Sequence, residues 1–170
     1  MSDVPLTVSY SNNINAGTAT ASASWDGDAN HTGGNGNNTF KILYLPVGTM
    51  CLGSPGHQIL QPINADGTSV FKQKSTVSAK FRVCDAYGNS VGTPGVVSTF
   101  NLFQTVSGTA TIAVNEPVDS TSAFTEFRWS PADQEWIFNI STKNLSANKT
   151  YFYRIGLNDG TYIEFSFGLR

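Results

Sequence analysis

Three oxygen-bearing side chains at alternate positions, Asp26, Asp28 and Asn30, form the first group in the sequence that could bind a metal ion. Carboxylate and amide oxygens at this spacing open the calcium-binding loops of proteins. The glutamate that closes an EF-hand loop does not follow. Asp and Asn also form local turns, because their side chains bond to nearby backbone groups. The sequence therefore leaves two alternatives, a calcium site and an ordinary solvated loop.

Two cysteines, Cys51 and Cys84, are the next residues with chemistry of their own. They could form one disulfide, which the loop-entropy relation values at about 3 to 4 kcal/mol. The alternative is two separate thiols, with Cys84 buried on a strand. Zinc is not expected, because His31 and His57 are not spaced with the cysteines as pairs of ligands.

Catalysis has little support in the sequence. Neither His31 nor His57 lies in a motif that supplies the carboxylate or nucleophile needed for general acid–base chemistry. No pair of acidic residues stands in a context typical of glycosidases. We therefore expect a protein that is not an enzyme and that has no cofactor apart from calcium.

Aromatic side chains are the remaining group that could bind a ligand, because flat rings stack on the CH groups of sugars. The rings that we expect to face a ligand are Trp25, Tyr151, Tyr153 and Tyr162. Tyr151 and Tyr153 share one face of a strand and Phe152 lies on the other, so one of the two sets must point away from a core. The alternative is that most rings are packing residues, since the alternation of Trp136 and Phe138 is typical of a sandwich core.

The composition favours β-structure and excludes several kinds of partner. Charged residues make up 13% of the chain, about half of the roughly 25% in an average globular protein. The net charge is −2 and basic residues do not cluster, so neither nucleic acid nor a polybasic membrane contact is expected. No apolar run approaches the roughly 20 residues that span a bilayer, so membrane insertion is not expected.

The first residues of the chain, Met1 to Tyr10, lack the pattern of a signal peptide. Met1-Ser2-Asp3 is typical of a start added for expression. We therefore expect any export signal to lie upstream in the full-length protein.

Alternating side chains predict strands along most of the chain, and with them an all-β fold of antiparallel, Ig-like β-sandwich modules. In the first part, Val4–Tyr10, Ala16–Trp25 and Thr39–Leu43 alternate in this way. The stretch from Asp26 to Asn37 is so rich in Gly and Asn that a loop is expected there. Because three strands cannot bury two faces by themselves, residues 1–45 are predicted to form a partial Ig-like segment.

A second domain is predicted for residues 46–170. Its first residues, 46–57, carry prolines and glycines and are expected to be irregular. Strands then recur at short intervals with turns between them, as in a β-sandwich. Asn158-Asp159-Gly160, between two alternating runs, is the strongest hairpin signal. No helix longer than one turn is predicted, and the best candidate is Asn144–Lys149.

Five short motifs stand in order in the first part of the chain. They are Tyr10-Ser11-Asn12-Asn13, Asn15-Ala16-Gly17-Thr18, Ala21-Ser22-Ala23, Gly27-Asp28-Ala29-Asn30-His31 and Thr39-Phe40-Lys41-Ile42. Together they resemble the second half of bacterial Ig-like repeats of the MBG type, which occur in tandem in surface and secreted proteins. Because the first half of such a repeat is absent, the resemblance implies an incomplete sandwich from Val4 to Leu43.

The second part carries a longer series of motifs. They are Leu60-Gln61-Pro62-Ile63, Ser69-Val70-Phe71-Lys72, Ser75-Thr76-Val77, Lys80-Phe81, Asp85-Ala86, Phe127-Arg128-Trp129, Tyr153-Arg154-Ile155, Leu157-Asn158-Asp159-Gly160 and Phe167-Gly168-Leu169-Arg170. From about Gln58 to Arg170 the chain thus resembles a C-terminal domain family named for its Pro-x-Lys-Phe (PxKF) motif. Ser78 stands at the position of the motif's proline. The resemblance implies a terminal, non-catalytic module of a large cell-surface protein.

These observations predict a structural or adhesive module of an exported bacterial surface protein, located outside the cell. Its partners would be other surface-protein domains or like subunits, and glycans if it binds sugars. Two alternatives are a carbohydrate-binding module and an extracellular filament subunit assembled by strand exchange. Because unpaired edges template pairing, residues 1–45 are predicted either to dock on the second module or to complete their sheet with a strand borrowed from a neighbouring subunit.

Overall fold

The computed structural model describes residues 5–170, and no helix occurs in this part of the chain. The predicted all-β, antiparallel fold is confirmed. The helical turn predicted at Asn144–Lys149 is not formed, because residues 144–148 contain turns and bends and Lys149 begins a strand. Met1 to Val4, which include the expected artificial start and the first residue of the Ig-like resemblance, lie outside the described residues. The chain divides into two compact units after Leu43, near the boundary expected after residue 45. None of residues 5–170 forms a helix of the length and hydropathy needed to cross a membrane.

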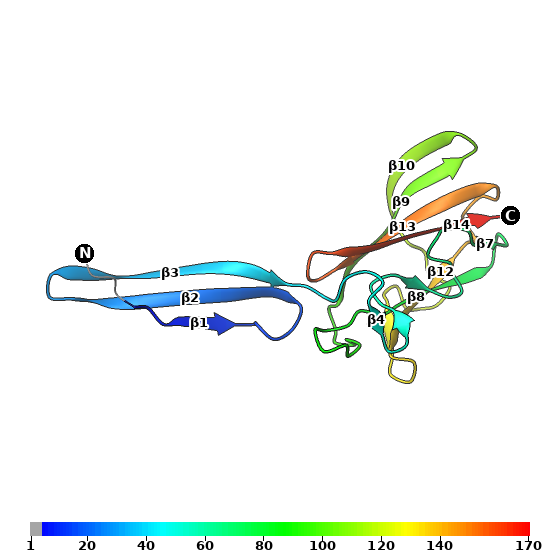
Figure 1. Ribbon diagram of the computed structural model, residues 1–170. Coiled ribbons are helices and arrows are strands. Elements are labelled where there is room, and N and C mark those ends of the chain that lie inside the picture. The colour runs from blue at the N-terminus through cyan, green and yellow to red at the C-terminus, as the bar shows by residue number, and fades with distance from the viewer. Residues whose placement is uncertain (1–4) are drawn as a thin grey trace. The chain divides into compact units, whose positions relative to one another are not determined.

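The first unit is a three-stranded antiparallel sheet (Figure 1). In the order in which they pair, its strands are β1 (Val8–Ser11), β2 (Gly17–Asp28) and β3 (His31–Ile42). The strands β2 and β3 form one long hairpin, in register from Gly17 opposite Ile42 to Asp28 opposite His31.

The prediction of a loop from Asp26 to Asn37 is wrong. These residues form the end of β2, a two-residue turn and the first half of β3. Gly and Asn disfavour strands when considered alone, but such preferences are weak, and continuous backbone pairing with β2 outweighs them. Asp28 closes the turn, because its carboxylate accepts a hydrogen bond from the backbone N–H of Asn30 at 2.8 Å.

The two faces of the first unit differ in polarity. Residues directly opposite each other on paired strands share a face, and successive residues alternate between faces. One face, which we call the apolar face, is formed by Val8, Tyr10, Ala19, Ala21, Ala23, Trp25, Phe40 and Ile42. The opposite face carries hydroxyl, amide and charged side chains, among them Ser9, Thr18, Thr20, Ser22, Ser24, Thr39 and Lys41. Tyr10 and Phe40 are 57% and 41% exposed, so the described residues of the first unit do not cover its apolar face.

The second unit, Tyr44–Arg170, contains a larger and a smaller sheet. The larger sheet consists, in order, of β10 (Ala110–Pro117), β9 (Val97–Ser107), β13 (Lys149–Leu157), β14 (Tyr162–Leu169) and β7 (Val70–Phe71). The smaller sheet consists of β11 (Arg128–Ser130), β12 (Glu135–Ser141), β8 (Thr76–Phe81) and β6 (Ile59–Leu60). A separate two-stranded sheet pairs β4 (Met50–Cys51) with β5 (Ser54–Pro55). All pairs are antiparallel except β7 with β14, which run parallel.

Aromatic rings fill the core of the second unit. Phe100 of β9 contacts both sheets, because its ring centroid lies 5.0 Å from that of Phe138 on β12 and 6.0 Å from that of Tyr153 on β13. Every second residue of β13 and β14 points inward. These inward side chains, all buried, are Tyr151, Tyr153, Ile155, Leu157, Ile163, Phe165, Phe167 and Leu169. The pattern of burial along both strands is therefore that of a sheet with one face in a core.

The stretch that resembles the Pro-x-Lys-Phe motif lies on β8. Phe81 is fully buried in the core. Lys80 points to the opposite face, and its ammonium group lies 2.7 Å from the buried carboxylate of Glu135 on β12. Ser78, at the proline position, donates a hydrogen bond from its hydroxyl to the side-chain oxygen of Asn139 at 3.1 Å. The stretch thus links β8 both to the core and to its neighbouring strand.

Candidate functional site

A disulfide joins Cys51 of β4 to Cys84, a few residues after β8. Both cysteines are buried. Nearby, His57 is 5% exposed, and its Nδ1 atom lies 3.1 Å from the backbone oxygen of Leu45. Its backbone N–H donates to the backbone oxygen of Arg82 at 2.7 Å. The disulfide and His57 therefore hold segment 46–57 against the end of β8. This segment was expected to be irregular, but it contains the short paired strands β4 and β5.

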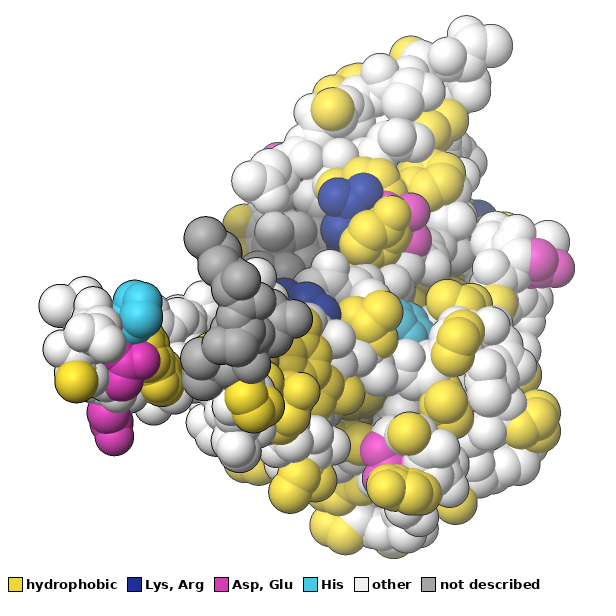
Figure 2. Space-filling view, turned by 60° about the vertical axis from the view of Figure 1, so that its left-hand side comes forward, with side chains coloured by type: hydrophobic (Ala, Val, Ile, Leu, Met, Phe, Trp, Pro, Cys, Tyr) yellow, Lys and Arg dark blue, Asp and Glu magenta, His cyan; other side chains and the backbone are white. Residues whose placement is uncertain are grey.

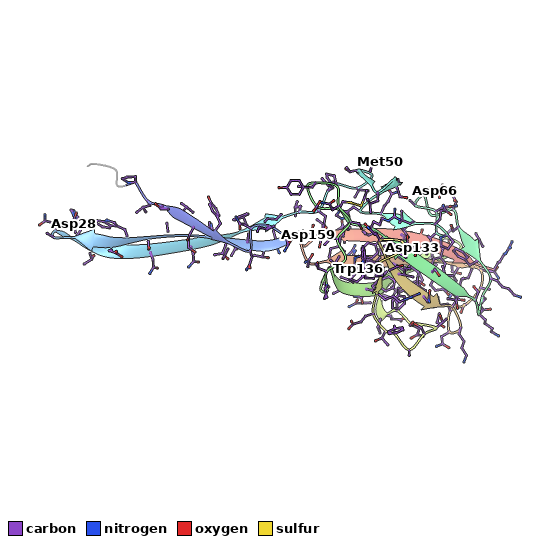
Figure 3. The ribbon with its side chains drawn as sticks, turned by 90° about the horizontal axis from the view of Figure 1, so that it is seen from below. Asp28, Met50, Asp66, Asp133, Trp136 and Asp159 are labelled. Atoms are coloured by element: carbon purple, nitrogen blue, oxygen red, sulfur yellow. A yellow bond between two sulfur atoms is a disulfide. The ribbon has the colours of Figure 1, made fainter. Side chains whose placement is uncertain are left out.

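The three residues considered for calcium lie at the tip of the β2–β3 hairpin, where Asp28 is labelled in Figure 3. Besides the bond from Asn30, Asp28 has the ring nitrogen Nδ1 of His31 at 2.8 Å from its carboxylate. The hydrogen bond from Asn30 and that from His31 lower the pKa of Asp28. Asp26 lies on β2 two residues earlier. Among the described residues, no three His, Cys, Asp or Glu side chains are grouped so that they could hold a metal ion.

Two of the four rings expected to face a ligand are buried, and the other two belong to different units of the chain. Tyr151 and Tyr153 do not face a ligand, because they are 3% and 1% exposed and pack in the core. The alternation along β13 predicts that one of its faces is buried, but which face that is depends on the side on which the smaller sheet packs. Trp25 lies on the apolar face of the first unit, and Tyr162 is exposed on β14.

Tyr162 belongs to a cluster on the outer face of the larger sheet. The guanidinium carbon of Arg154 lies 4.7 Å from the ring centroid of Phe103 and 4.8 Å from that of Tyr162. Arg154 also donates from Nε to the carboxylate of Glu164 at 2.7 Å. Phe152 packs against Phe103, with ring centroids 6.4 Å apart. Figure 2 shows basic side chains (dark blue) beside hydrophobic (yellow) and acidic (magenta) ones on the surface. The guanidinium group of this cluster thus already contacts two of its rings and a carboxylate.

A cleft of about 820 Å³ opens at one side of the second unit. Part of its lining comes from residues 92–99, which include the segment before β9 and the first residues of that strand, and part from residues 117–126, which begin with the last residue of β10. Aromatic side chains line it as well: Phe100, Phe127, Trp129, Trp136 and Phe138. Its volume lies within the range of about 300 to 1,000 Å³ that is usual for small-ligand sites.

The two indoles of the cleft are positioned by a short hairpin. Trp129 of β11 and Trp136 of β12 lie directly opposite each other, with ring centroids 5.5 Å apart. The indole N–H of Trp136 (labelled in Figure 3) donates to the backbone oxygen of Val91 at 2.9 Å. The indole of Trp129 lies on Gly92, where an added Cβ atom would come within 2.1 Å of the ring. Hydrogen bonding and close packing therefore fix both rings.

Polar side chains complete the lining. Five of them carry hydroxyl groups: Ser98, Thr99, Ser120, Ser122 and Thr125. Two are carboxylates, Asp119 and Glu126. The side-chain N–H of Asn144 donates to Oδ2 of Asp119 at 3.0 Å, which orients this carboxylate. The cleft thus combines hydrophobic rings with many hydrogen-bonding groups.

Sequence reasoning did not identify this cleft. The alternation of Trp136 and Phe138 predicts core positions for both, and both are buried. A usable signal was present, because Trp129 and Trp136 lie two residues on either side of the turn at Pro131–Gln134, and a hairpin closed by that turn brings them opposite each other. The segments 92–99 and 117–126, in contrast, have no periodic pattern that places them beside each other.

The fold and these sites define an all-β protein with an antiparallel, sandwich-like second unit. No protein-family model matches the chain, and no curated protein matches its sequence.

Proposed function

We propose that the chain is a non-catalytic structural and adhesive module of an exported bacterial surface protein. The disulfide between Cys51 and Cys84 is the observation that carries this proposal. Disulfides persist in oxidising environments such as the cell surface and are rare in the cytosol, where thiols are kept reduced. Here the bridge ties the short strand β4 to the residues that follow β8, which is a structural role.

Tyr151 supports the inference that the second unit is an Ig-like β-sandwich module. The hydroxyl group of Tyr151 donates to the backbone oxygen of Ser146 at 2.9 Å and accepts from the backbone N–H of Ser146 at 2.7 Å. A tyrosine near the start of a strand that bonds to the backbone a few residues upstream is the tyrosine corner of Ig-like sandwiches. For the first unit, its uncovered apolar face is what a partial MBG-type repeat would present.

Acidic residues in turns also support a structural role. Hydrogen bonds from the side chain and backbone of Thr68 lower the pKa of Asp66. Desolvation raises the pKa of Asp85, but hydrogen bonds from Asn89 and Tyr87 outweigh it, so that this pKa is also lowered. Both carboxylates thus stay ionised and stabilise the turns in which they lie.

Labelling of intact cells tests the proposed location. Antibodies against the chain should bind unpermeabilised cells of the source organism, and chain recovered from those cells should contain no thiol that reacts without prior reduction. A cytosolic protein of the same cells serves as the control for lysis. Labelling that requires permeabilisation, or free thiols at Cys51 and Cys84, would contradict export.

A second candidate function, a subunit of an extracellular assembly, is favoured by the apolar face of the first unit. A sheet with one apolar face is stable when another layer packs on that face. A sheet from a second subunit would complete a sandwich, with the layers about 10 Å apart. Strand exchange at the edge strands β1 or β3 is the other route to assembly.

Phe40→Lys and Thr39→Lys form a matched pair of variants for this candidate. Both add one positive charge to β3, but only Phe40 lies on the apolar face. Light scattering should show assembly that grows with concentration for the wild type and Thr39→Lys, and little assembly for Phe40→Lys. A wild type that stays monomeric at every concentration would rule this function out.

A further inference from the structure

We propose that the cleft lined by Trp129 and Trp136 binds a neutral sugar. This site is separate from the residues on which the structural role rests. It would bind its ligand in the purified protein wherever the chain is located. The two proposals can therefore fail independently.

The first argument is the aromatic lining. Trp129 is partly exposed where it lines the cleft, whereas Trp136 behind it is buried. An indole is flat and apolar, so a pyranose ring can lay its CH groups against it and remove both surfaces from water. Because Gly92 and Trp136 already hold the indole, little conformational freedom is lost on binding.

The second argument is the type of hydrogen-bonding group. Sugar hydroxyls donate and accept, and the five hydroxyl side chains that line the cleft can do both. The carboxylates of Asp119 and Glu126 accept, and hydrogen bonds to a charged acceptor are the stronger kind. An ammonium ligand, by comparison, only donates and would leave the hydroxyl donors of the lining without a partner.

The third argument is charge. The described residues that line the cleft include two carboxylates and no Lys, Arg or His. A phosphate, a sulfate or a uronic acid would meet like charge without compensation. The chemistry of the lining therefore favours a ligand without net charge.

Titration of the purified chain with sugars tests the proposal. The probes are neutral disaccharides (maltose, cellobiose and lactose), with galacturonic acid and spermidine as the acidic and cationic comparisons. We expect at least one neutral disaccharide to change the tryptophan fluorescence with saturation, and calorimetry to give the same dissociation constant. If none of the neutral disaccharides binds at millimolar concentration, or if only galacturonic acid or spermidine binds, the proposal is wrong.

Three variants locate the binding. Trp129→Ala should weaken binding at least about tenfold, which corresponds to about 1.4 kcal/mol. Gly92→Ala should weaken it while every polar group stays in place, because the new Cβ atom displaces the indole. Trp25→Phe is the matched control, since it removes an indole of the first unit and should leave the dissociation constant unchanged.

Glu126→Gln is a milder variant that still tests the proposal if Trp129→Ala or Gly92→Ala disturbs the fold. Glu126 is exposed, so this variant should fold normally, and we expect its affinity for the neutral disaccharide to fall because a charged acceptor is lost. Thermal unfolding of each variant separates lost binding from lost structure. Wild-type affinity in both a folded Trp129→Ala and Glu126→Gln would show that the sugar binds elsewhere and would overturn the proposal.

Discussion

Two neighbouring tyrosines on the same face of β13 differ in what their hydroxyl groups contact. The hydroxyl of Tyr151 makes two hydrogen bonds to the backbone of Ser146. The hydroxyl of Tyr153 is buried, and among the described residues it has no hydrogen-bond partner. Burial raises the pKa of Tyr153 well above its usual value. A buried polar group without a partner costs free energy, whereas a paired one contributes to stability.

The variants Tyr151→Phe and Tyr153→Phe should therefore have opposite effects on the free energy of unfolding. Tyr151→Phe should lower it by about 1 to 2 kcal/mol, because the backbone N–H of Ser146 loses its acceptor. Tyr153→Phe should leave it unchanged or raise it by about 1 kcal/mol. Urea unfolding followed by circular dichroism measures both. Equal losses for the two variants would contradict the difference in hydrogen bonding.

Tyr44 makes the stability of the folded protein depend on pH in the alkaline range. Desolvation and the nearby carboxylate of Asp159 raise the pKa of Tyr44 to about 12, compared with about 10 in an unfolded chain. Because the folded state holds this proton more tightly, the contribution of Tyr44 to stability is complete below pH 10. It is lost as the pH rises through about 12.

We expect the free energy of unfolding to fall between about pH 10 and pH 12, and to fall less steeply in Tyr44→Phe. Urea titrations at several pH values measure both slopes. Tyr153 titrates in the same direction, so Tyr44→Phe should reduce the slope without abolishing it. An unchanged slope in this variant would show that Tyr44 does not contribute.

Among the elements, the β2–β3 hairpin shows that glycine has different roles at neighbouring positions. A Cβ atom at Gly33 would lie 2.6 Å from the backbone oxygen of Trp25, so the two strands approach closely there. Cβ atoms at Gly34 and Gly36 would meet nothing within 4 Å. Gly33 is therefore required by the hairpin, whereas Gly34 and Gly36 have room for a side chain.

Gly33→Ala should disrupt the tip of the hairpin and speed amide hydrogen exchange in β2 and β3 near the turn. Gly36→Ala, the matched control, should leave exchange unchanged or slow it, because alanine loses less backbone entropy on folding, an effect of about 0.4 to 1 kcal/mol. Hydrogen exchange followed by NMR resolves the individual amides. Equal exchange rates in the two variants would contradict a close approach at Gly33.

At the scale of the whole molecule, the two units are stabilised differently. The second unit has a buried aromatic core and a disulfide. The first unit has an apolar face that its own described residues leave open, with Ala19 as its one fully buried member. Stability of the first unit should therefore depend on what packs against that face, and stability of the second on its core and covalent bridge.

Reduction of the Cys51–Cys84 disulfide should lower the free energy of unfolding of the second unit by about 3 to 4 kcal/mol, because the open chain gains loop entropy when unfolded. Urea unfolding with and without reductant, followed by tryptophan fluorescence in a Trp25→Phe background, measures this change. The double variant Cys51→Ser, Cys84→Ser should already have the lower stability and should not respond to reductant. A wild-type midpoint that does not move on reduction would contradict the prediction.

The sequence alone was sufficient to predict the all-β class, the strand periodicity and the turn at Asn158–Gly160. Alternation and turn chemistry are properties of a few consecutive residues, so no distant contact is needed to recognise them. Only the tertiary structure decided that Tyr151 and Tyr153 point inward, that Asp26–Asn37 is mostly strand, and that Trp129 lines a cleft. Each of these depends on which distant strands pair or pack together, and the energy of that pairing outweighs the weak preferences of single residues.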